Sequence, residues 1–405
     1  MKRVVVTGIG MINSLGLDKE SSFKAIVEGK CGIKEIASFD ASNHSVKIAA
    51  EITDFDPSTV MDAKEMKKAD RFIQLGIKAA NEAMEDAAFG DDIDFERFGI
   101  SSASGIGGLA NIEKNSVICD TRGPRRISPF FIPSSLVNML GGFVSIYQGL
   151  KGPNISSVTA CAAGTHAVSE ATKTIMLGGA DRMLVVGAEA AICPVGIGGF
   201  GSMKALCTDN DNPQGASRPF DATRGGFVMG EGAGALVLEE YEVALERGAN
   251  IYAEVVGFGE SGDANHITSP VVDGPLRAVK AAMAMAGNPK VDYINAHGTS
   301  TPANDKNETA AIKEVFGAKE NCPPVSSIKG QLGHCLGAAG AIEAVTTLMA
   351  MRDGVLPPTI NYNNPDEACD LDYVPNKSRE AEINVAVSNS FGFGGTNGVL
   401  IFKKI

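Results

Sequence analysis

Short runs of β-branched and apolar residues alternate along the chain with longer Ala-rich segments. Residues 71–87 show the helical pattern, because Ile73, Ile77, Ala80 and Met84 recur every three or four positions. This alternation predicts an α/β protein with a mainly parallel sheet and helices on its faces. Predicted strands cover residues 4–6, 98–103, 155–158, 183–186, 251–257, 291–295, 325–328 and 385–390, and predicted helices cover 21–28, 71–87, 162–177, 274–286, 308–316 and 338–351.

The two halves of the chain end in similar segments. Residues 227–238 read Phe-Val-Met-Gly-Glu-Gly-Ala-Gly-Ala-Leu-Val-Leu, and residues 391–402 read Phe-Gly-Phe-Gly-Gly-Thr-Asn-Gly-Val-Leu-Ile-Phe. Each is a Gly-rich turn followed by an apolar strand. We interpret this as an internal duplication, although chance similarity between Gly-rich hairpins would give the same pattern. We therefore expect two domains, residues 1–245 and 246–405.

Composition narrows the class of protein. The 405 residues are 44% hydrophobic and 21% charged, which is ordinary for a globular chain large enough to need no disulfides. The 8 cysteines form no C-x-x-C pair, and scattered thiols fit a reducing cytoplasm. A net charge of −12 argues against nucleic acid as a partner. We expect no membrane span and no signal peptide, because no apolar run approaches about 18 residues.

The best candidate nucleophile is Cys161. A predicted strand ends at Val158, small residues follow, and a helix begins at or just after Cys161. Such a strand-to-helix turn presents a side chain as a nucleophile elbow does. We expect the N-terminus of the helix to stabilise the thiolate and lower the pKa of the thiol. The simpler interpretation is that Cys161 is a small buried hydrophobe.

Two of the five histidines follow predicted strands in the same way. His297 comes after the strand 291–295, and His334 comes after the strand 325–328. Ligands in α/β proteins bind at the carboxyl ends of strands, so Cys161, His297 and His334 could meet at one rim of the sheet. A mononuclear Cys-His-His zinc site is an alternative, but no close ligand spacing supports it.

Other groups could assist this trio. Backbone N–H groups at Cys161 and Phe393 could form an oxyanion hole, because the Gly-rich turn 391–395 is suited to presenting an amide. Lys329 could orient the site electrostatically, together with Glu343 on the following helix. Taken alone, Lys329 is expected to be a solvated charge at the end of a strand.

Four separated motifs together resemble the β-ketoacyl-acyl-carrier-protein synthases, and they follow the order of that family over nearly the whole chain. Three shorter stretches, at residues 105–109, 123–131 and 217–221, resemble the type II bacterial members. The motifs are Thr-Ala-Cys161-Ala, Asn-Ala-His297-Gly-Thr-Ser-Thr, Lys329 with Gly-His334 and Gly-Ala-Ala-Gly340, and Ser-Asn-Ser-Phe-Gly-Phe393-Gly-Gly-Thr-Asn.

The resemblance implies a thiolase-like fold of two duplicated βαβαβ-type halves in an α/β/α/β/α arrangement, and a cytoplasmic homodimer. It implies condensation of an acyl group on Cys161 with a decarboxylating malonyl unit, catalysed by His297 and His334 with Lys329 assisting. Both substrates would arrive on the phosphopantetheine arm of an acyl carrier protein, with no cofactor and no metal.

The same resemblance assigns roles around the site. Thr299 and Thr301 would hydrogen-bond the pantetheine arm, Ile106 would lie at the acyl pocket, and Phe393 would gate it. A local basic patch would dock the acidic carrier protein despite the acidic chain as a whole. The residues of this expected patch are Lys64, Lys67, Lys68, Arg125, Arg126 and Lys204.

This chain departs from the family pattern around the lysine. Ile328 precedes Lys329 where Thr is usual, residues 330–332 read Gly-Gln-Leu in place of Ser-Met-Thr, and Asn304 replaces a common Gly. None of these departures removes a catalytic group, but they leave open the shape of the lysine loop and the substrate preference.

Other classes of protein are alternatives to this interpretation. A thiolase would use a second cysteine as base where this chain has His334, and a chain-initiating synthase would have Asn there. A polyketide-type synthase shares the chemistry. A dinucleotide-binding oxidoreductase has only a partial Gly8-Ile-Gly10 fingerprint with Asn13 at the third glycine position. A non-catalytic partner subunit would not need the Cys-His-His set.

Overall fold

Ten strands form one large sheet in the computed structural model, which describes residues 1–405. The strand order is β10-β9-β13-β14-β8-β1-β7-β6-β4-β5. The predicted strands and helices are all present, with ends shifted by a few residues.

The elements of the first half are β1 (Val4–Asn13), α1 (Lys19–Val27), β2 (Lys34–Glu35), β3 (Ile48–Ala49), α2 (Ala63–Met66), α3 (Arg71–Asp86), β4 (Phe98–Ala103), α4 (Leu109–Arg122), α5 (Phe131–Ser135), α6 (Met139–Gln148), β5 (Asn154–Ser157), α7 (Ala163–Met176), β6 (Arg182–Glu189), α8 (Pro194–Ser202), α9 (Pro213–Ala216), β7 (Gly232–Glu240) and α10 (Tyr241–Glu246). Those of the second half are β8 (Ala253–Gly262), α11 (Asp273–Met285), β9 (Tyr293–Asn295), α12 (Pro302–Phe316), β10 (Val325–Ser326), α13 (Lys329–Leu332), α14 (Ala339–Asp353), β11 (Val355–Leu356), β12 (Arg379–Glu380), β13 (Val385–Gly392) and β14 (Thr396–Lys403).

The two halves of the sheet repeat one topology. Read inward from its outer edge, the first half runs β5-β4-β6-β7-β1 and the second runs β10-β9-β13-β14-β8. In both, the three outer strands are parallel and the two inner ones are antiparallel. The halves meet where β1 pairs with β8 over Val5 and Val6. The repeat supports the duplicated fold, and the boundary at residues 245/246 stays a prediction.

The expectation of a mainly parallel sheet was wrong for the centre of the molecule. β13 turns back into β14 through a tight Gly-rich hairpin, with Gly392 opposite Thr396. A hairpin connection makes its strands antiparallel, whereas parallel pairing needs a longer crossover. The sheet is therefore mixed, with parallel pairing confined to the outer strands.

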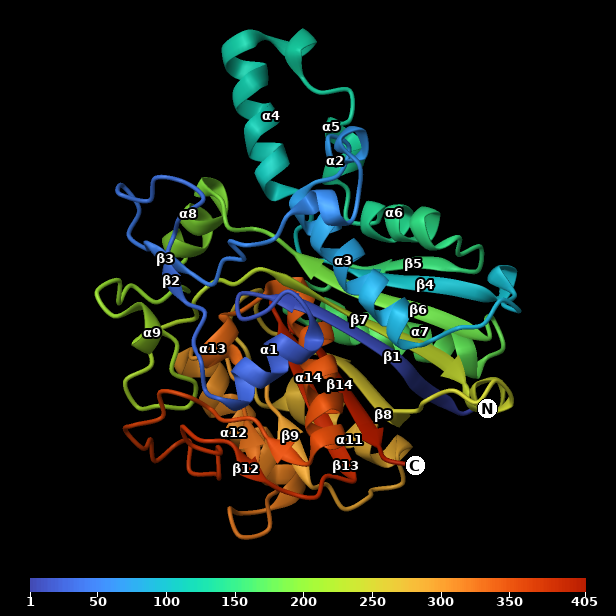
Figure 1. The fold of residues 1–405 in the computed structure, drawn as a ribbon. Coiled ribbons are helices and arrows are strands. Elements are labelled where there is room, and N and C mark those ends of the chain that lie inside the picture. Colours follow the sequence, from blue (N-terminus) through green and yellow to red (C-terminus); the bar gives the residue numbers. More distant parts are fainter.

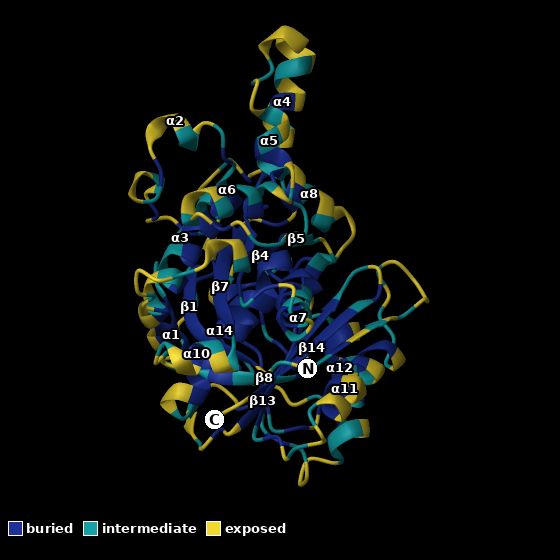
Figure 2. Ribbon diagram, turned by 90° about the vertical axis from the view of Figure 1, so that its right-hand side faces the viewer, coloured by how far each residue is buried: buried dark blue, intermediate teal, exposed yellow.

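The layers follow from the helix packing. Helices α3 and α6 cover the outer face of the first half-sheet, α7 and α14 lie between the half-sheets, and α11 packs on the outer face of the second (Figure 1). This is the expected α/β/α/β/α arrangement. Helix α14 is buried at every residue from Ala339 to Met351, as a helix enclosed on all sides must be. Figure 2 shows the same buried centre in dark blue.

Glycines allow the closest approach between layers. A Cβ on Gly8 or Gly10 would lie 2.3 or 2.2 Å from a carbonyl oxygen of α3. A Cβ on Gly164 of α7 would lie 2.6 Å from the backbone of α14. Gly8 and Gly10 therefore serve the contact between β1 and α3, and this explains the partial fingerprint without a nucleotide.

Helix α4 projects from the body of the molecule, and the chain returns through a 3-10 turn (Pro124–Arg126) to α5 (Figures 1 and 2). The projection is largely exposed, with Val117 and Ile132 more than half exposed to solvent. No helix combines the length and the apolar content needed to cross a membrane.

The contact between β1 and α3 makes a testable prediction. Gly10→Ala should lower the midpoint of thermal unfolding by several degrees, because a methyl group there collides with backbone that cannot move freely, at a cost of about 1–3 kcal/mol. Gly90→Ala is the matched control, since a Cβ at Gly90 meets nothing within 4 Å. Equal unfolding midpoints for the two variants would contradict the close-packing explanation.

Candidate active site

A cavity of about 350 Å³ opens where the carboxyl ends of the parallel strands meet the Gly-rich hairpin of the second half. Cys161, His297 and His334 all line it, together with Phe391 and Phe393. The strand-end argument thus brings the three candidate residues to one place.

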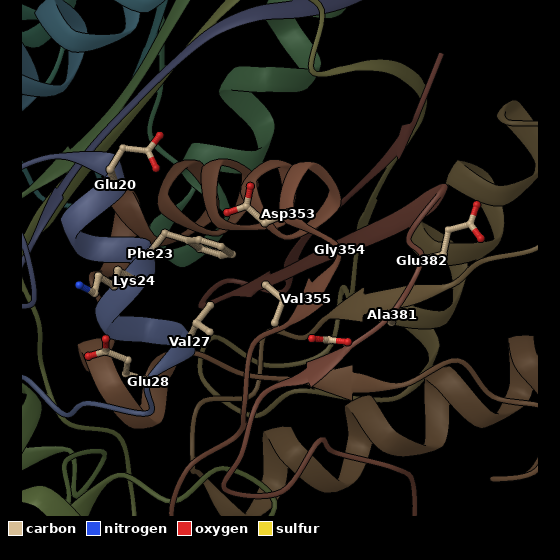
Figure 3. A pocket seen from close by; sticks show the side chains of 11 residues that line it. Glu20, Phe23, Lys24, Val27, Glu28, Asp353, Gly354, Val355, Ala381 and Glu382 are labelled. Carbon is tan, nitrogen blue, oxygen red and sulfur yellow. The ribbon is translucent and has the colours of Figure 1, made fainter.

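A larger surface hollow, of about 800 Å³, lies elsewhere, between α1 and the turn after α14 (Figure 3). Its walls hold no cysteine or histidine, and 5 of its 11 lining residues are carboxylates. The nucleophilic chemistry therefore belongs to the smaller cavity. The carboxylates of the hollow are Glu20, Glu28, Asp353, Glu380 and Glu382.

Cys161 lies on the expected elbow. Strand β5 ends at Ser157, a 3-10 turn covers Ala160–Ala162, and α7 begins at Ala163. Ala160 has φ 48°, a left-handed conformation that is rare outside glycine and that turns the chain sharply before the cysteine. Cys161 is buried, at 9% exposure, with its side chain at the cavity wall.

The expected direction of the thiol pKa was wrong. Burial raises the pKa of Cys161 to about 12, outweighing the positive charge of Lys329 and the backbone N–H groups of Phe393 and Cys161, which lower it. The helix N-terminus and the lysine favour the thiolate, but removal from water disfavours it more strongly. The two amides that act on the sulfur are those expected for the oxyanion hole.

The two histidine rings lie close together at a steep angle, with centroids 5.4 Å apart and planes at 83°. Each residue is 2% exposed. Burial and the charge of Lys329 hold the pKa of both imidazoles well below their ordinary value, so both rings are neutral at neutral pH. The backbone N–H of Leu336 donates to Nδ1 of His334 at 3.2 Å, and this places the proton of the neutral ring on Nε2.

Lys329 is not the solvated charge that the sequence alone favoured. It is 2% exposed, and its Nζ donates to the carbonyl oxygen of His297 at 2.7 Å and to a carboxylate oxygen of Glu343. Burial raises the pKa of Glu343 to about 7, although Lys329 opposes the shift. The pairing of Lys329 with Glu343 that we expected is present.

The unusual residues beside Lys329 are buried, and only the side-chain oxygen of Gln331 has no hydrogen-bond partner among their side chains. Ile328 belongs to the central hydrophobic core, and residues 329–332 form the short helix α13. The side-chain amide of Gln331 donates to the carbonyl oxygen of Ile26 at 2.6 Å, and its backbone carbonyl accepts from Gly32 at 2.8 Å. The loop is therefore anchored to the end of α1 and leaves Lys329 in place.

Two buried carboxylates that the sequence analysis missed hold the backbone around His297. Glu308 accepts from the N–H groups of His297 and Gly298 at 2.8 Å each, and burial raises its pKa to about 7. Asp305 accepts from the N–H of Thr299 at 3.0 Å. Both lie on α12, which directly follows the histidine motif. Two acidic residues so close to this motif are the sequence feature that could have identified them.

The predicted pantetheine residues lie at the cavity. Thr299 and Thr301 line its wall, and their hydroxyl groups are 2.9 Å apart. Phe393 also lines the cavity, and its ring lies 6.4 Å from that of Phe200. Ile106 does not line this cavity, but it packs against the hydrophobic cluster that contains Cys161.

The six basic residues come from three separate segments of the chain. Lys204 lines the cavity, Lys64, Lys67 and Lys68 lie on or just after α2, and Arg125 and Arg126 lie in the turn after the projecting helix α4 (Figure 1). The Nζ of Lys68 lies 5.6 Å from the ring of Phe130, so the α2 group adjoins the base of the projection.

No group of three or more His, Cys, Asp or Glu side chains is placed to hold a metal ion, so the zinc alternative lacks its ligand set. Several buried side-chain oxygens of β9, α14 and β13 have no hydrogen-bond partner. The oxygens belong to Asn295, Glu343, Ser388 and Asn389.

Comparison with known proteins gives one consistent family. Residues 1–244 match the N-terminal domain of β-ketoacyl synthases, and residues 252–363 match the C-terminal domain. The chain is 50% identical to 3-oxoacyl-[acyl-carrier-protein] synthase 2 of Coxiella burnetii, over 100% of this chain and 99% of that protein. It is 47% identical to the protein of the same name from Staphylococcus aureus strain N315, over 100% and 98%.

Solved structures of ketosynthases are also similar to this chain. A β-ketoacyl synthase from Burkholderia phymatum is similar with a TM-score of 0.94 and 34% identity, covering 100% of both chains. A ketosynthase solved in complex with a type II polyketide acyl-carrier protein is similar with a TM-score of 0.90 and 33% identity, covering 100% of this chain and 99% of that one.

The buried Lys329–Glu343 pair predicts a large loss of stability on removal of one partner. Lys329→Ala should lower the free energy of unfolding by about 3 kcal/mol or more at pH 8, because it leaves a buried carboxylate without its cation. Lys30→Ala is the control, since Lys30 pairs with Glu28 on the surface, where solvent screens the pair, and its removal should lower the free energy of unfolding far less. Urea denaturation measures both.

The same variant should show a particular pH dependence. Without Lys329, the pKa of Glu343 rises above its already raised value of about 7, so the folded state binds a proton that the unfolded state has lost. Stability then falls as pH rises, and the loss should be smaller at pH 6 than at pH 8. A loss that is equal at both pH values would contradict the buried-carboxylate explanation.

Proposed function

The chain belongs to the β-ketoacyl synthase family of condensing acyltransferases, and on that premise we propose that it is a 3-oxoacyl-[acyl-carrier-protein] synthase of the type II class, acting in fatty acid biosynthesis. It joins an acyl group from an acyl carrier protein to a malonyl group on a second carrier. The products are 3-oxoacyl carrier protein, CO2 and free carrier protein. The observation that carries this proposal is the shared cavity of Cys161, His297 and His334.

In the first step, the sulfur of Cys161 attacks the carbonyl carbon of the acyl thioester. The tetrahedral oxyanion accepts hydrogen bonds from the backbone N–H groups of Cys161 and Phe393, the two amides that also act on the free thiol. The C–S bond to the carrier then breaks, and the proton of the Cys161 thiol goes to the departing pantetheine sulfur. The acyl group is left as a thioester on Cys161.

In the second step, the malonyl thioester loses CO2 and becomes an enolate. Negative charge develops on the thioester oxygen, and N–H donors of the two neutral imidazoles stabilise it. The Nε2–H tautomer of His334 supplies one such donor. The enolate carbon attacks the acyl-Cys161 carbonyl, the Cys161 sulfur leaves, and a proton from solvent restores the thiol.

Lys329 favours this chemistry through its charge and through a hydrogen bond. Its positive charge lowers the pKa of the Cys161 thiol, which aids departure of the sulfur. Together with burial, the same charge keeps His297 and His334 uncharged. Its bond to the carbonyl oxygen of His297 also fixes that histidine's backbone. Lys329 is proposed to orient the site, with Glu343 as structural support, and not to exchange protons with substrate.

The substrates are proposed to enter past Thr299 and Thr301, whose hydroxyl groups hydrogen-bond the pantetheine arm. Phe393 gates the cavity, and the acyl chain extends past Cys161 toward Ile106. The carrier protein docks on Lys64, Lys67, Lys68, Arg125, Arg126 and Lys204. The wide spacing of these residues fits a docking face that two copies of the chain complete together.

A homodimer is supported by the free edge of the sheet. Strand β5 is the outermost strand of the first half, and pairing with a second copy would satisfy its open edge. The adjoining apolar side chains are exposed, and Val158, Ile132 and Leu136 are 54%, 58% and 47% exposed. All eight cysteines are free, which fits the reducing cytoplasm where we propose that the protein acts.

A polyketide-type synthase is the second candidate, because one similar solved structure is a ketosynthase with a type II polyketide acyl-carrier protein, and another is a ketosynthase/chain length factor. Their identities to this chain, 33% and 36%, are lower than the 50% shared with the fatty acid type relatives. The fatty acid assignment is therefore favoured.

Incubation with an acyl carrier protein thioester should produce a stable acyl adduct on Cys161 alone. Intact-mass measurement followed by peptide mapping detects the adduct and its position. Cys207 is an internal control, because it is also buried but does not line the cavity. Absence of an adduct, or an adduct on another cysteine, would rule out the acyl-Cys161 intermediate.

The two steps should separate in variants. Cys161→Ala should abolish condensation yet retain decarboxylation of malonyl carrier protein, because the histidine donors are intact. His297→Ala should lose decarboxylation by about 100-fold or more, the usual cost of removing an oxyanion donor. Release of CO2 from labelled malonyl carrier protein measures both. Condensation by Cys161→Ala would contradict the mechanism.

A further inference from the structure

A fully buried carboxylate lies behind the nucleophile and has no part in the steps above. Glu189 is the last residue of β6 and is 0% exposed. Its Oε1 accepts from the hydroxyl of Ser104 at 2.8 Å and from the N–H groups of Ile106 and Gly107 at 3.2 Å each. Its Oε2 accepts from the N–H groups of Gly105 at 2.6 Å and Gly337 at 3.0 Å.

Two chain segments converge on this carboxylate. Residues 104–107 follow β4 and carry Ile106, and residues 336–338 form the 3-10 turn after His334. A Cβ on Gly337 would lie 2.0 Å from the backbone nitrogen of Gly105, and one on Gly105 would lie 3.5 Å from the carbonyl oxygen of Ala160 on the nucleophile elbow. The segments are packed backbone to backbone around the side chain of Glu189.

The contacts connect Glu189 to both reacting groups. Gly337 donates to Glu189, and its neighbour Leu336 donates to Nδ1 of His334, the bond that sets the tautomer of that ring. On the other side, Ile106 belongs to the hydrophobic cluster around Cys161. Five donors and no acceptor surround the carboxylate, which favours its ionised form, although burial raises its pKa.

We propose that Glu189 is a positioning residue that ties the acyl-pocket loop at residues 104–107 to the turn after His334, and so sets both acyl-chain selectivity and the orientation of His334. The proposal rests on the proposed function, since it assigns the acyl chain to the side of Ile106. Glu189 touches no substrate atom. It acts through the two backbone segments that it holds together.

The test is Glu189→Gln, which keeps the shape of the side chain but turns one acceptor into a donor facing N–H groups. The ratio of kcat/KM for long over short acyl chains should change about tenfold or more, because the loop carrying Ile106 loses its anchor. Decarboxylation of malonyl carrier protein should fall in parallel, because the turn that orients His334 is released.

A measurement that needs no substrate distinguishes a positioning role of Glu189 from general disruption of the fold. The Cys161 thiol faces the charges of Lys329 and Glu189 and the rings of His297 and His334, and the negative charge of Glu189 raises its pKa. In Glu189→Gln, the pH profile of alkylation of Cys161 by iodoacetamide should therefore shift to lower pH by about half a unit or more. Disruption of the fold alone does not predict that direction.

Glu82→Gln is the matched control. Glu82 also accepts from backbone N–H groups, those of Met11 and Lys19 at 2.9 Å each, but lies on α3 away from the cavity. It should leave the chain-length ratio and the alkylation profile unchanged. Ser104→Ala removes a single donor and should change the chain-length ratio in the same direction but less, so it tests the proposal even if Glu189→Gln fails to fold.

A folded Glu189→Gln protein with the chain-length ratio and alkylation profile of the unsubstituted chain would overturn the proposal. So would an unchanged ratio in Ser104→Ala combined with failure of Glu189→Gln to fold. Lack of an acyl adduct on the unsubstituted chain would count against the proposed function instead, and the alkylation profile would still decide the role of Glu189.

Discussion

The site depends on one buried cation. Lys329 has no access to water, so its charge must be satisfied by the carboxylate of Glu343 and the carbonyl oxygen of His297. In a water-poor cavity such a charge acts strongly on its neighbours. It lowers the pKa of the Cys161 thiol and of both imidazoles at once. Burial and this charge together keep both imidazoles neutral, and for the thiol the charge offsets only part of the effect of burial.

The duplicated sheet is what brings these groups together. Cys161 follows an outer strand of the first half, and the two histidines follow outer strands of the second. Helices α7 and α14 lie between the half-sheets, where Gly164 and Gly340 allow the helix backbones to touch. Glu189 then links the loop after β4 to the turn after His334. Residues from both halves therefore line the cavity.

Much of this could be predicted from the sequence because it depends on local pattern. Strand-helix alternation, small residues after strands and the rule that sites lie at strand ends placed Cys161, His297 and His334 correctly at one rim. The predictions that were wrong depend on the burial of side chains, which the local sequence pattern does not reveal. The thiol pKa moves up because desolvation outweighs the helix and Lys329. Lys329 itself is buried, and Glu189 is an acidic residue at the end of an apolar strand whose partners are distant in sequence. The mixed sheet could not be predicted in this way, because the alternation of strands and helices indicates parallel pairing and does not reveal the antiparallel pairing of the inner strands.

The claim that burial and the charge of Lys329 keep both imidazoles of the cavity neutral can be measured directly. Nitrogen-15 NMR of histidine-labelled protein, assigned with His297→Gln and His334→Gln variants, reports the charge and tautomer of each ring. The account predicts that both rings stay neutral from pH 6 to pH 8, with the proton of His334 on Nε2. An imidazolium signal for either ring at pH 7, or an Nδ1–H tautomer for His334, would contradict it.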